Sequence, residues 1–441
     1  MTESTGVLEF AMISDPGAAR YGSLSNGTSE SWGLRPERPI QTPFRCHAVM
    51  KSSERMNMSR KFKLKTTQSE LMRLIGAVNG TIGHRNALPV LNNVMLQSLS
   101  DGTIAAVGND LEIEITAVAS IGEFEGQLDT TIPCKKLFDI LQTMNATEPL
   151  EISVADSKSV VLKGAGGKFS FGSITSQDFP RMQAQDDEVA VLPIEIPQSA
   201  LKSLIDKTAY VTPIRDIRYY LISSQLVIES NKISLCSTDG HRLATDSFEL
   251  AQSVDSRIEV LVPRGTILEL KRLLKNTDEP VTMLFYKNQA RFRFGGVELV
   301  TKLVDGKFPD VSRVIPKNNM DKIGIQRSDM LLAVQRAAVF VHEKENGIRL
   351  EVTTDIAGGR IDIKGKGISA SAESVDLAFP VEYSGPNMVM SYKLHYLLDS
   401  LANMTGERIT LALDAGPSVG QALFTVDGDA NFKYVLMPMR L

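Results

Sequence analysis

The chain has little of several residue types that mark specialised protein classes. Its 441 residues include three cysteines, Cys46, Cys134 and Cys236, and no CxxC spacing joins them. Such an odd, scattered set argues against a disulfide framework and against a cysteine zinc site. No apolar run reaches the roughly 18 residues of a membrane helix, and the N-terminus lacks the basic start and apolar core of a secretory signal. We therefore expect a soluble, cytoplasmic protein without a metal or cofactor.

An excess of charge of either sign is also missing. The chain has 48 Lys and Arg against 52 Asp and Glu, a formal net charge of -4. This balance argues against a protein coated with basic surface for nucleic acid, so any DNA contact must be local. Hydrophobic residues make up 43% and charged residues 23%, as in ordinary globular proteins. At roughly 100–200 residues per domain, the length predicts two to four domains.

Residues 1–57 differ from the rest of the chain. They are rich in Gly, Ser, Pro and Arg, and they show no sustained helical or strand period. Scattered acidic residues argue against a mitochondrial transit peptide, which is poor in acids. We expect a disordered extension, or a start codon assigned upstream of the true one at Met56 or Met58.

The strongest signal after this extension is internal repetition. The segment Gln68-Ser69-Glu70-Leu71 recurs as Gln198-Ser199-Ala200-Leu201, and more loosely around Ser328. Separate landmarks keep the same offset of about 130 residues, which chance similarity would not preserve. These landmarks are Ile132-Pro133 with Val262-Pro263, and Phe179-Pro180 with Phe308-Pro309.

Each copy has the same order of elements. An extended stretch leads into an amphipathic helix, alternating strands follow, then a second helix and another series of hairpins. In the first copy, Thr67 and Glu70 form a capping-box pattern at the start of the first helix. The sequence predicts an α+β protein of three repeated helix-β-helix-β domains, with the helices on one side of the sheets. The predicted domains are residues 58–190, 191–317 and 318–441.

The predicted helices also carry basic faces. In RGTILELKRLLKN, Arg264, Lys271, Arg272 and Lys275 fall in one sector of about 100° opposite the apolar residues. A solvated helix face is the simpler interpretation for one helix alone. Lysines recur on equivalent elements, however, which suggests a shared positive surface that phosphates can approach. They are Lys135 and Lys136 in copy one, with Lys202 and Lys207 in copy two.

From Met58 to Leu441 the chain resembles the bacterial DNA polymerase III beta subunits, the beta sliding clamps. The resemblance rests on HRNALPVLNNVML from His84, IRYYL from Ile217, STDGHRLA from Ser237, TKLVDGKFPD from Thr301 and YVLMPMRL from Tyr434. It implies a processivity factor for DNA polymerase, in which a head-to-tail homodimer closes as a ring around duplex DNA. Helices would lie inside the ring and sheets outside. Phosphate contacts in such a ring need only be weak and independent of sequence.

The resemblance also implies a hydrophobic cleft between the second and third domains. Short peptides of the replicative polymerase, the clamp loader and other proteins would bind there, and methionine-rich walls would suit many related peptides. Gly416 stands where the family favours an apolar side chain, which would make one wall shallower. Carried over by position, the cleft comprises Leu221, Thr238, Gly240, His241, Arg242, Leu243, Pro309, Arg313, Val314, Ser418, Val435, Leu436, Met437, Pro438, Met439, Arg440 and Leu441.

Two further surfaces follow from the helix faces and the resemblance. One is a subunit interface, in which the strand KFSFGSI would present Lys168, Phe169 and Phe171 to Val339 and Phe340 of a neighbouring subunit. The alternative interpretation is that Phe169 and Phe171 are ordinary core residues. The other surface is the one that would contact DNA. Gly265 and Asn346 stand where the family often has basic residues. The expected DNA-binding residues are Arg85, Lys135, Lys136, Lys202, Lys207, Arg215, Tyr219, Arg264, Lys271, Lys275 and Lys344.

The polar segment STDGHRLATDSFEL, residues 237–250, could also suggest an active site. His241 would act as a general base, oriented by Asp239 or Asp246. The sequence supplies no nucleophile elbow, phosphate loop or metal set to accompany it, and a DG turn explains the backbone. We expect no enzyme activity. The alternatives are a DNA-acting enzyme that uses Asp239 and His241, and a repeat-built scaffold that binds no nucleic acid.

Overall fold

The computed structural model describes residues 62–83, 88–156, 159–182, 193–316, 321–341, 347–356, 358–366, 374–413 and 420–439. All of these belong to one compact unit within Met58–Leu441. The expected extension over residues 1–57 lies outside the described residues.

The first copy of the repeat contains two helices and nine strands among the described residues. In chain order these are β1 (Phe62–Thr67), α1 (Gln68–Val78), β2 (Asn93–Ser98), β3 (Ile104–Asn109), β4 (Ile113–Ala119), β5 (Glu123–Glu125), β6 (Asp129–Pro133), α2 (Cys134–Gln142), β7 (Pro149–Asp156), β8 (Ser159–Gly164) and β9 (Gly167–Gly172).

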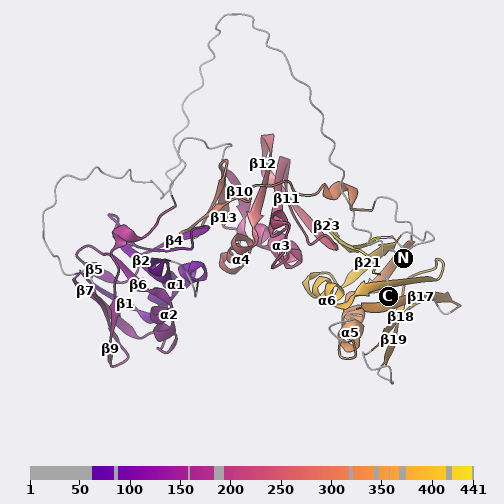
Figure 1. The fold of residues 1–441 in the computed structure, drawn as a ribbon, viewed down its shortest axis with the longest axis horizontal. Coiled ribbons are helices and arrows are strands. Elements are labelled where there is room, and N and C mark those ends of the chain that lie inside the picture. Colours follow the sequence, from indigo (N-terminus) through magenta and orange to yellow (C-terminus); the bar gives the residue numbers. More distant parts are fainter. Residues whose placement is uncertain are drawn as a thin grey trace, which may run out of the picture. The chain divides into compact units, whose positions relative to one another are not determined.

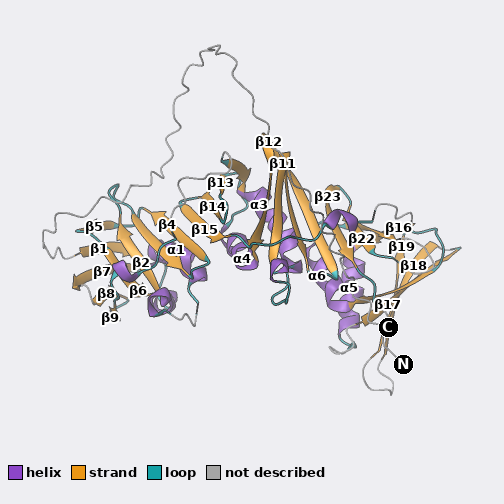
Figure 2. Cartoon of the chain, turned by 45° about the horizontal axis from the view of Figure 1, so that its top comes forward, coloured by secondary structure: helices purple, strands orange, loops and turns teal. Residues whose placement is uncertain are grey.

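The second copy follows the same order, with its middle strands merged into two long ones. Its elements are β10 (Ile194–Pro197), α3 (Gln198–Thr208), β11 (Ser223–Thr238), β12 (Arg242–Pro263), α4 (Arg264–Leu273), β13 (Pro280–Phe285), β14 (Gln289–Phe294) and β15 (Val297–Lys302). Figure 2 shows β11 and β12 side by side as long strands.

The third copy completes the repeat. Its elements are β16 (Asp321–Gln326), α5 (Arg327–Ala338), β17 (Gly347–Asp355), β18 (Gly358–Lys366), β19 (Ser374–Val381), β20 (Met388–Lys393), α6 (Leu394–Asn403), β21 (Arg408–Leu413), β22 (Ala422–Val426) and β23 (Asp429–Leu436). The predicted α+β class with repeated helix-β-helix-β domains is confirmed.

Within each copy the two helices lie against one another, as α1 with α2, α3 with α4 and α5 with α6 (Figure 1). The first helix of each pair also packs on strands of its own copy, for example α1 on β3 and β4. The apolar stripe of α1 explains this packing, because Leu71, Leu74, Ile75 and Val78 are all buried. Burial of such helix stripes against the sheets produces one continuous apolar core in copies one and two and a second core in copy three.

The start of α1 has the predicted capping box. The Thr67 hydroxyl accepts a hydrogen bond from the Glu70 backbone N–H, and the Glu70 carboxylate accepts one from the Thr67 N–H. The Thr66 hydroxyl donates to the same carboxylate at 2.8 Å. These bonds, the Thr66 hydroxyl first, hold the pKa of Glu70 below its usual value.

The sheets continue from one copy into the next. An eight-stranded sheet has the order β10-β13-β14-β15-β4-β3-β2-β6, in which β15 of copy two pairs antiparallel with β4 of copy one. A six-stranded sheet has the order β11-β12-β23-β22-β21-β16, in which β23 of copy three pairs antiparallel with β12 of copy two. Neighbouring copies are thus joined by backbone hydrogen bonds as well as by side chains.

Two further sheets, one in the first copy and one in the third, also end in edge strands among the described residues. The five-stranded sheet β5-β1-β7-β8-β9 ends at β9, and the four-stranded sheet β19-β18-β17-β20 ends at β19. An edge strand exposes a row of backbone N–H and C=O groups that can pair with another strand.

The capping box predicts a pH-dependent contribution from Glu70. Because its pKa is lowered in the folded protein, Glu70 stabilises the fold fully above its usual value of about 4.3, and this contribution is lost as the pH falls through the lowered value. Replacement of Glu70 by Ala should therefore lower the thermal midpoint at pH 7, and the difference from the unmodified chain should shrink towards pH 3. The same replacement at the exposed Glu249 of β12 is the control. A Glu70→Ala difference that does not change between pH 7 and pH 3 would contradict the assignment.

Candidate functional site

The polar segment singled out by sequence forms a tight turn between β11 and β12. The Asp239 Oδ1 accepts hydrogen bonds from the backbone N–H groups of His241 and Arg242, at 2.9 and 3.0 Å. Gly240 has a φ of 86°, a conformation that glycine adopts without a steric penalty. The Arg218 guanidinium donates to the Asp239 carbonyl and lies against Gly240, where an added Cβ would come within 2.9 Å of it. A glycine therefore fits this position better than any other residue.

The acidic residues of the turn are occupied by structural contacts. The second oxygen of Asp239 accepts from the Arg242 Nε at 3.0 Å, so both oxygens of this carboxylate are bonded. Asp246 is buried and pairs with the Lys207 Nζ at 2.9 Å. His241 is exposed on the outer side of the turn. Neither carboxylate is placed to orient this imidazole as a general base, because each already has a cationic partner.

A small apolar cluster lies next to the turn. Its buried members are Leu221, Cys236, Leu243, Leu261, Phe308 and Val435, and the partly buried Val304, Val311, Val314 and Ile315 pack against it. Four of the predicted cleft residues, Leu221, Leu243, Val314 and Val435, are thus brought together from four separated segments. The turn is tied to the C-terminal segment as well, since the Met437 N–H donates to the His241 carbonyl at 2.9 Å.

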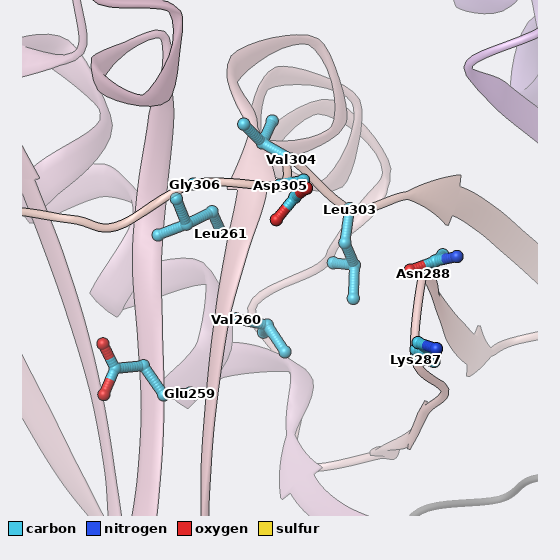
Figure 3. Close-up of a pocket in the computed structure, with 9 residues that line it drawn as sticks. All are labelled: Glu259, Val260, Leu261, Lys287, Asn288, Leu303, Val304, Asp305 and Gly306. Atoms are coloured by element: carbon cyan, nitrogen blue, oxygen red, sulfur yellow. The ribbon is translucent and has the colours of Figure 1, made fainter. Parts of the chain in front are cut away.

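A cavity of about 270 Å³ adjoins this cluster. The two features share Leu261 and Val304. Figure 3 shows Glu259 and Val260 on one side and Lys287 and Asn288 on the other, with Leu303 between them. The cavity therefore extends from the cluster towards β14 of the second copy, away from the predicted C-terminal wall.

Arg242 is a buried charge at the junction of the second and third copies. Its Nη1 donates to Asp399 of α6 at 2.8 Å, and its guanidinium carbon lies 4.2 Å from the centre of the Tyr396 ring. Burial acts to lower the pKa of Arg242, but Tyr434, Asp399 and Asp239 together raise it above its ordinary value. The guanidinium stays charged and joins the turn to α6.

A second buried cation crosses the same junction. Lys207, near the end of α3, lies between Asp246 of β12 and Asp429 of copy three, at 2.9 and 2.5 Å. Burial acts to lower the pKa of Lys207, and its bonds to Asp429 and Asp246 raise it above the ordinary value. Lys207 was expected on the DNA surface by its position on the helix. Its side chain is instead only 14% exposed and its charge is balanced, so we remove it from that surface.

The other predicted DNA-binding residues differ in whether their charged groups already have partners within the protein. Lys202 donates to the Lys271 carbonyl, Lys271 pairs with Asp206, and Arg264 donates to the Thr212 carbonyl. The predicted residues that the structure leaves exposed are Lys135, Lys136, Arg215, Tyr219 and Lys275. The basic sector of α4 is therefore partly used for contacts inside the protein. Arg272 of that sector donates to the Gly76 and Ala77 carbonyls at the end of α1.

The predicted subunit-interface residues fall into two groups. Val339 and Phe340 follow α5 and are 82% and 43% exposed. Lys168 is exposed on β9, whereas Phe171 belongs to the hydrophobic core and Phe169 packs against that core. The phenylalanines thus point into their own domain, as the core interpretation expected, and their strand β9 lies at the edge of its sheet.

Five of the predicted site residues lie outside the described residues: Arg85, Lys344, Ser418, Arg440 and Leu441. Pro309 is half-buried, Arg313 is exposed, and Thr238 and Leu436 are buried. Of the C-terminal residues, Met437 and Met439 are half-buried and Pro438 is exposed. Within the described ranges no group of three or more His, Cys, Asp or Glu could hold a metal ion. No helix in the same ranges has the length and apolar character to cross a membrane.

Sequence reasoning missed the partners that make Arg242 a junction residue. Asp399 and Tyr396 come from α6, and Tyr210, whose carbonyl accepts from the Arg242 Nη2 at 3.4 Å, follows α3; none has a motif of its own. A signal was present in the repeat, because Asp399 has the same place in its helix as Glu269 in α4 and Asp139 in α2. Glu269 also pairs with an arginine, Arg272, at the junction of the first two copies.

Comparison with known proteins gives consistent matches along the described chain. Family models for the N-terminal, central and C-terminal domains of the DNA polymerase III beta subunit match residues 61–183, 195–310 and 312–440. The beta sliding clamp of Pseudomonas putida is 33% identical over 377 residues, which cover 85% of this chain and 99% of the relative. That of Escherichia coli K12 is 32% identical over 381 residues, covering 86% and 100%.

Solved structures give the same match. The DNA polymerase III subunit beta of Pseudomonas aeruginosa has a TM-score of 0.78 and 30% identity, covering 86% of this chain and all of that one. A sliding clamp of the same organism bound to griselimycin has a TM-score of 0.79 and 30% identity, covering 87% and 100%.

Burial predicts that two similar ion pairs contribute differently to stability. Arg242 and Arg313 each pair with the aspartate three residues earlier at 3.0 Å, but their side chains are 9% and 79% exposed. Arg242→Gln should lower the free energy of unfolding by about 3 kcal/mol, since it leaves the largely buried Asp239 carboxylate without its cationic partner. Arg313→Gln should cost at most about 1 kcal/mol, since water screens that pair. Urea unfolding of both variants measures the difference, and equal losses would refute it.

Proposed function

The chain belongs to the DNA polymerase III beta subunit family and is a DNA polymerase processivity factor, and we propose that two copies of it close head to tail into a ring around duplex DNA. The helices of all three domains would line the ring and the sheets would form its outside. The boundaries 58–190, 191–317 and 318–441 are the proposed limits of these domains.

The observation that carries the proposal is a pairing rule that recurs at both junctions within the chain. The last strand of one copy, β15 or β23, pairs antiparallel with β4 or with the first part of β12 in the preceding copy. The registers are equivalent, because Leu299 faces Ile115 at the first junction and Tyr434 faces Ala244 at the second.

The rule joins the last strand of one copy to the equivalent of β4 in the copy before it. It leaves one last strand and one equivalent of β4 without such a partner, each at the edge of its sheet. The last strand of copy one is β9, and the copy-three equivalent of β4 is β19. Strand β9 of one subunit can therefore pair with β19 of the next, and a second such contact closes a two-subunit ring. A heterologous contact of this kind continues the repeat across the subunit boundary.

The register of the internal junctions supplies residue pairs for the proposed contact. Phe169 corresponds to Leu299 and Tyr434, and Val375 corresponds to Ile115 and Ala244, by their places in the hairpins. Phe169 would face the partner's Val375, and Lys168 would face the partner's Asp376. Opposite charges directly across an antiparallel pair are favourable. The exposed Val339 and Phe340 would be covered by the same contact.

The proposed DNA surface is electrostatic and does not read bases. Lys135 and Lys136 on α2 and Lys275 after α4 are exposed, and Arg215 and Tyr219 lie on an exposed loop of copy two. Contacts of lysine and arginine with phosphates act on any sequence and are weakened by salt. In a closed ring such contacts can exchange while the duplex stays enclosed, so the protein can slide.

The apolar cluster beside the Asp239–Arg242 turn is the proposed docking cleft for partner peptides. Leu221, Leu243 and Val435 would form its floor, and Met437 and Met439 would form a deformable wall. Partners would be the replicative polymerase, the clamp loader and other proteins with a short apolar peptide. We propose that griselimycin, which a Pseudomonas aeruginosa relative binds, binds this chain in the same cleft.

We further propose that the protein has no catalytic centre and works in the cytoplasm, where the duplex it encloses would lie. The bonding of Asp239 and Asp246 to Arg242 and Lys207 supports a structural role for both carboxylates. Catalysis by Asp239 and His241 therefore has no supporting geometry among these residues.

Ring closure predicts that retention on DNA depends on the topology of the DNA. When loaded onto nicked circular DNA, the chain should remain bound through gel filtration at moderate salt, because an enclosed duplex has no end. Linearisation of the same DNA should release it within minutes. Equal retention on circular and linear DNA would exclude enclosure.

Charge-reversal variants test the proposed subunit contact in the same assay. Lys168→Glu and Asp376→Lys should each weaken the dimer and shorten retention on circular DNA, and the double exchange should recover both, since the opposite charges are then restored. Lys163→Glu, on the neighbouring strand β8, is the matched control and should leave the dimer intact. Sedimentation measures the mass. Failure of the double exchange to recover the dimer would refute this register.

The cleft predicts a separable loss of partner binding. Deletion of residues 437–441 removes the methionine wall and the bond from Met437 to the turn, so griselimycin binding should be lost while sedimentation still gives a dimer. Val389→Ala, which alters an exposed apolar side chain elsewhere in copy three, is the control. Unchanged griselimycin affinity after the deletion would move the site away from the C-terminal segment.

A further inference from the structure

The turn beside the proposed cleft has a twin at the junction of the first two copies. The Asp110 Oδ1 accepts hydrogen bonds from the backbone N–H groups of Glu112 and Ile113, at 2.9 and 2.7 Å, as Asp239 does from His241 and Arg242. The position of Gly240 is taken by Leu111, which has a φ of 76°. A leucine in this conformation is rare and strained, so the surrounding structure must hold the turn in place.

An apolar cluster also lies beside the twin turn. Its buried members are Val90, Leu91, Met95, Val107 and Phe179. Leu91 occupies the repeat position of Leu221, and Phe179 that of Phe308. Thr131, which is buried, takes the place of the cluster residue Leu261, and a charged difference lies in the strand that follows the turn. Where the proposed cleft has the apolar Leu243, the twin has Glu114, which is 3% exposed.

Glu114 is satisfied by three hydrogen bonds and an ion pair with Arg181. Its carboxylate accepts from the Asn109 Nδ2 at 3.0 Å, from the Arg181 Nε at 3.1 Å and from the Met182 backbone N–H at 2.8 Å, and the ion pair places the Arg181 Nη2 at 3.0 Å. Asn109 donates in addition to the Pro180 carbonyl. Residues 180–182 follow the last strand of copy one, so the carboxylate holds the start of the connection to copy two against the turn.

The corresponding connection after copy two is not held in this way. Residues 309–316 and 238–243 are all described, and no hydrogen bond joins the two segments. Asp310 stands in the place of Arg181 and bonds within its own segment, to Ser312 and Arg313. Instead, Val311, Val314 and Ile315 pack on the apolar cluster, and such packing can yield to another apolar chain.

We propose that Glu114 and Arg181 form a latch that closes the twin site to apolar peptides, so that each chain offers one open cleft. A peptide entering the twin would have to displace a buried carboxylate that holds three hydrogen bonds and an ion pair, and would leave its charge without partners. The latch is therefore a specificity determinant that acts by exclusion. It rests on the proposed cleft, because only an open cleft gives the latch a peptide to exclude.

The test converts the twin to the residues of the cleft. In the full chain, Glu114→Leu with Arg181→Asp introduces the residue types of Leu243 and Asp310. Calorimetric titration with griselimycin should give one molecule per unmodified chain and two per variant chain. The control is Glu112→Leu, which adds a leucine to the same turn while the latch remains, and it should bind one.

The possible outcomes separate the latch from the cleft. One molecule bound by both the unmodified chain and the double variant would overturn the latch alone. No binding to the unmodified chain would overturn the cleft and the latch with it. If the double variant does not fold, hydrogen exchange at the Met182 amide provides the second measurement. Exchange should be at least ten-fold faster in Arg181→Ala than in the unmodified chain, with no change at Ser312, and an unchanged Met182 rate would overturn the latch.

Discussion

The structure depends on one constraint, which is that the N–H and C=O groups along the edge of a strand need hydrogen-bond partners, from another strand or from water. Within the chain this need joins the copies, because β15 completes the edge at β4 and β23 completes the edge at β12. Each junction is therefore a continuous sheet. The edges at β9 and β19 have the same need, and an exposed edge invites association. The closure proposed above would pair both of these edges, whereas an open-ended assembly would leave one of each unpaired at its ends.

Buried ion pairs make the junction of the second and third domains specific as well as continuous. Arg242 and Lys207 each reach from the second domain to carboxylates of the third, Asp399 and Asp429. A strand pair alone could slip by two residues and keep its faces, whereas a buried cation between fixed carboxylates cannot. The same Arg242 fixes the turn beside the proposed cleft, through Asp239. The shape of the cleft is thus coupled to how the two domains meet.

Much of the fold could be predicted from sequence patterns, because helical periodicity and helix capping depend on residues that are close together in the chain. The capping box of Thr67 and Glu70, the buried stripe of α1 and the α+β class all follow from patterns within a few turns of chain. The residues of the cleft came instead from resemblance, and the structure clusters Leu221 with Leu243 and Val435. The role of Lys207 could not be predicted, because its helix face shows a free charge and its partners, Asp246 and Asp429, are distant in sequence. A helical wheel predicts which face of its helix a side chain lies on, but it does not predict which residues of other segments lie next to that side chain.

Comparison of the two turns shows how one duplicated backbone can carry different side-chain chemistry. The backbone bonds of Asp110 and Asp239 are the same, so the turn itself tolerates either surrounding. What differs is the chemistry of the next buried position. Leu243 leaves an apolar surface whose only cover is other apolar side chains, and hydrophobic contacts are interchangeable. Glu114 demands specific donors, and once Asn109, Arg181 and Met182 supply them, removal of any cover exposes a buried charge. Apolar side chains that pack on Leu243 can be replaced by those of a peptide, which suits a docking site. The hydrogen bonds to Glu114 need donors in fixed positions, which suits a permanent contact between segments.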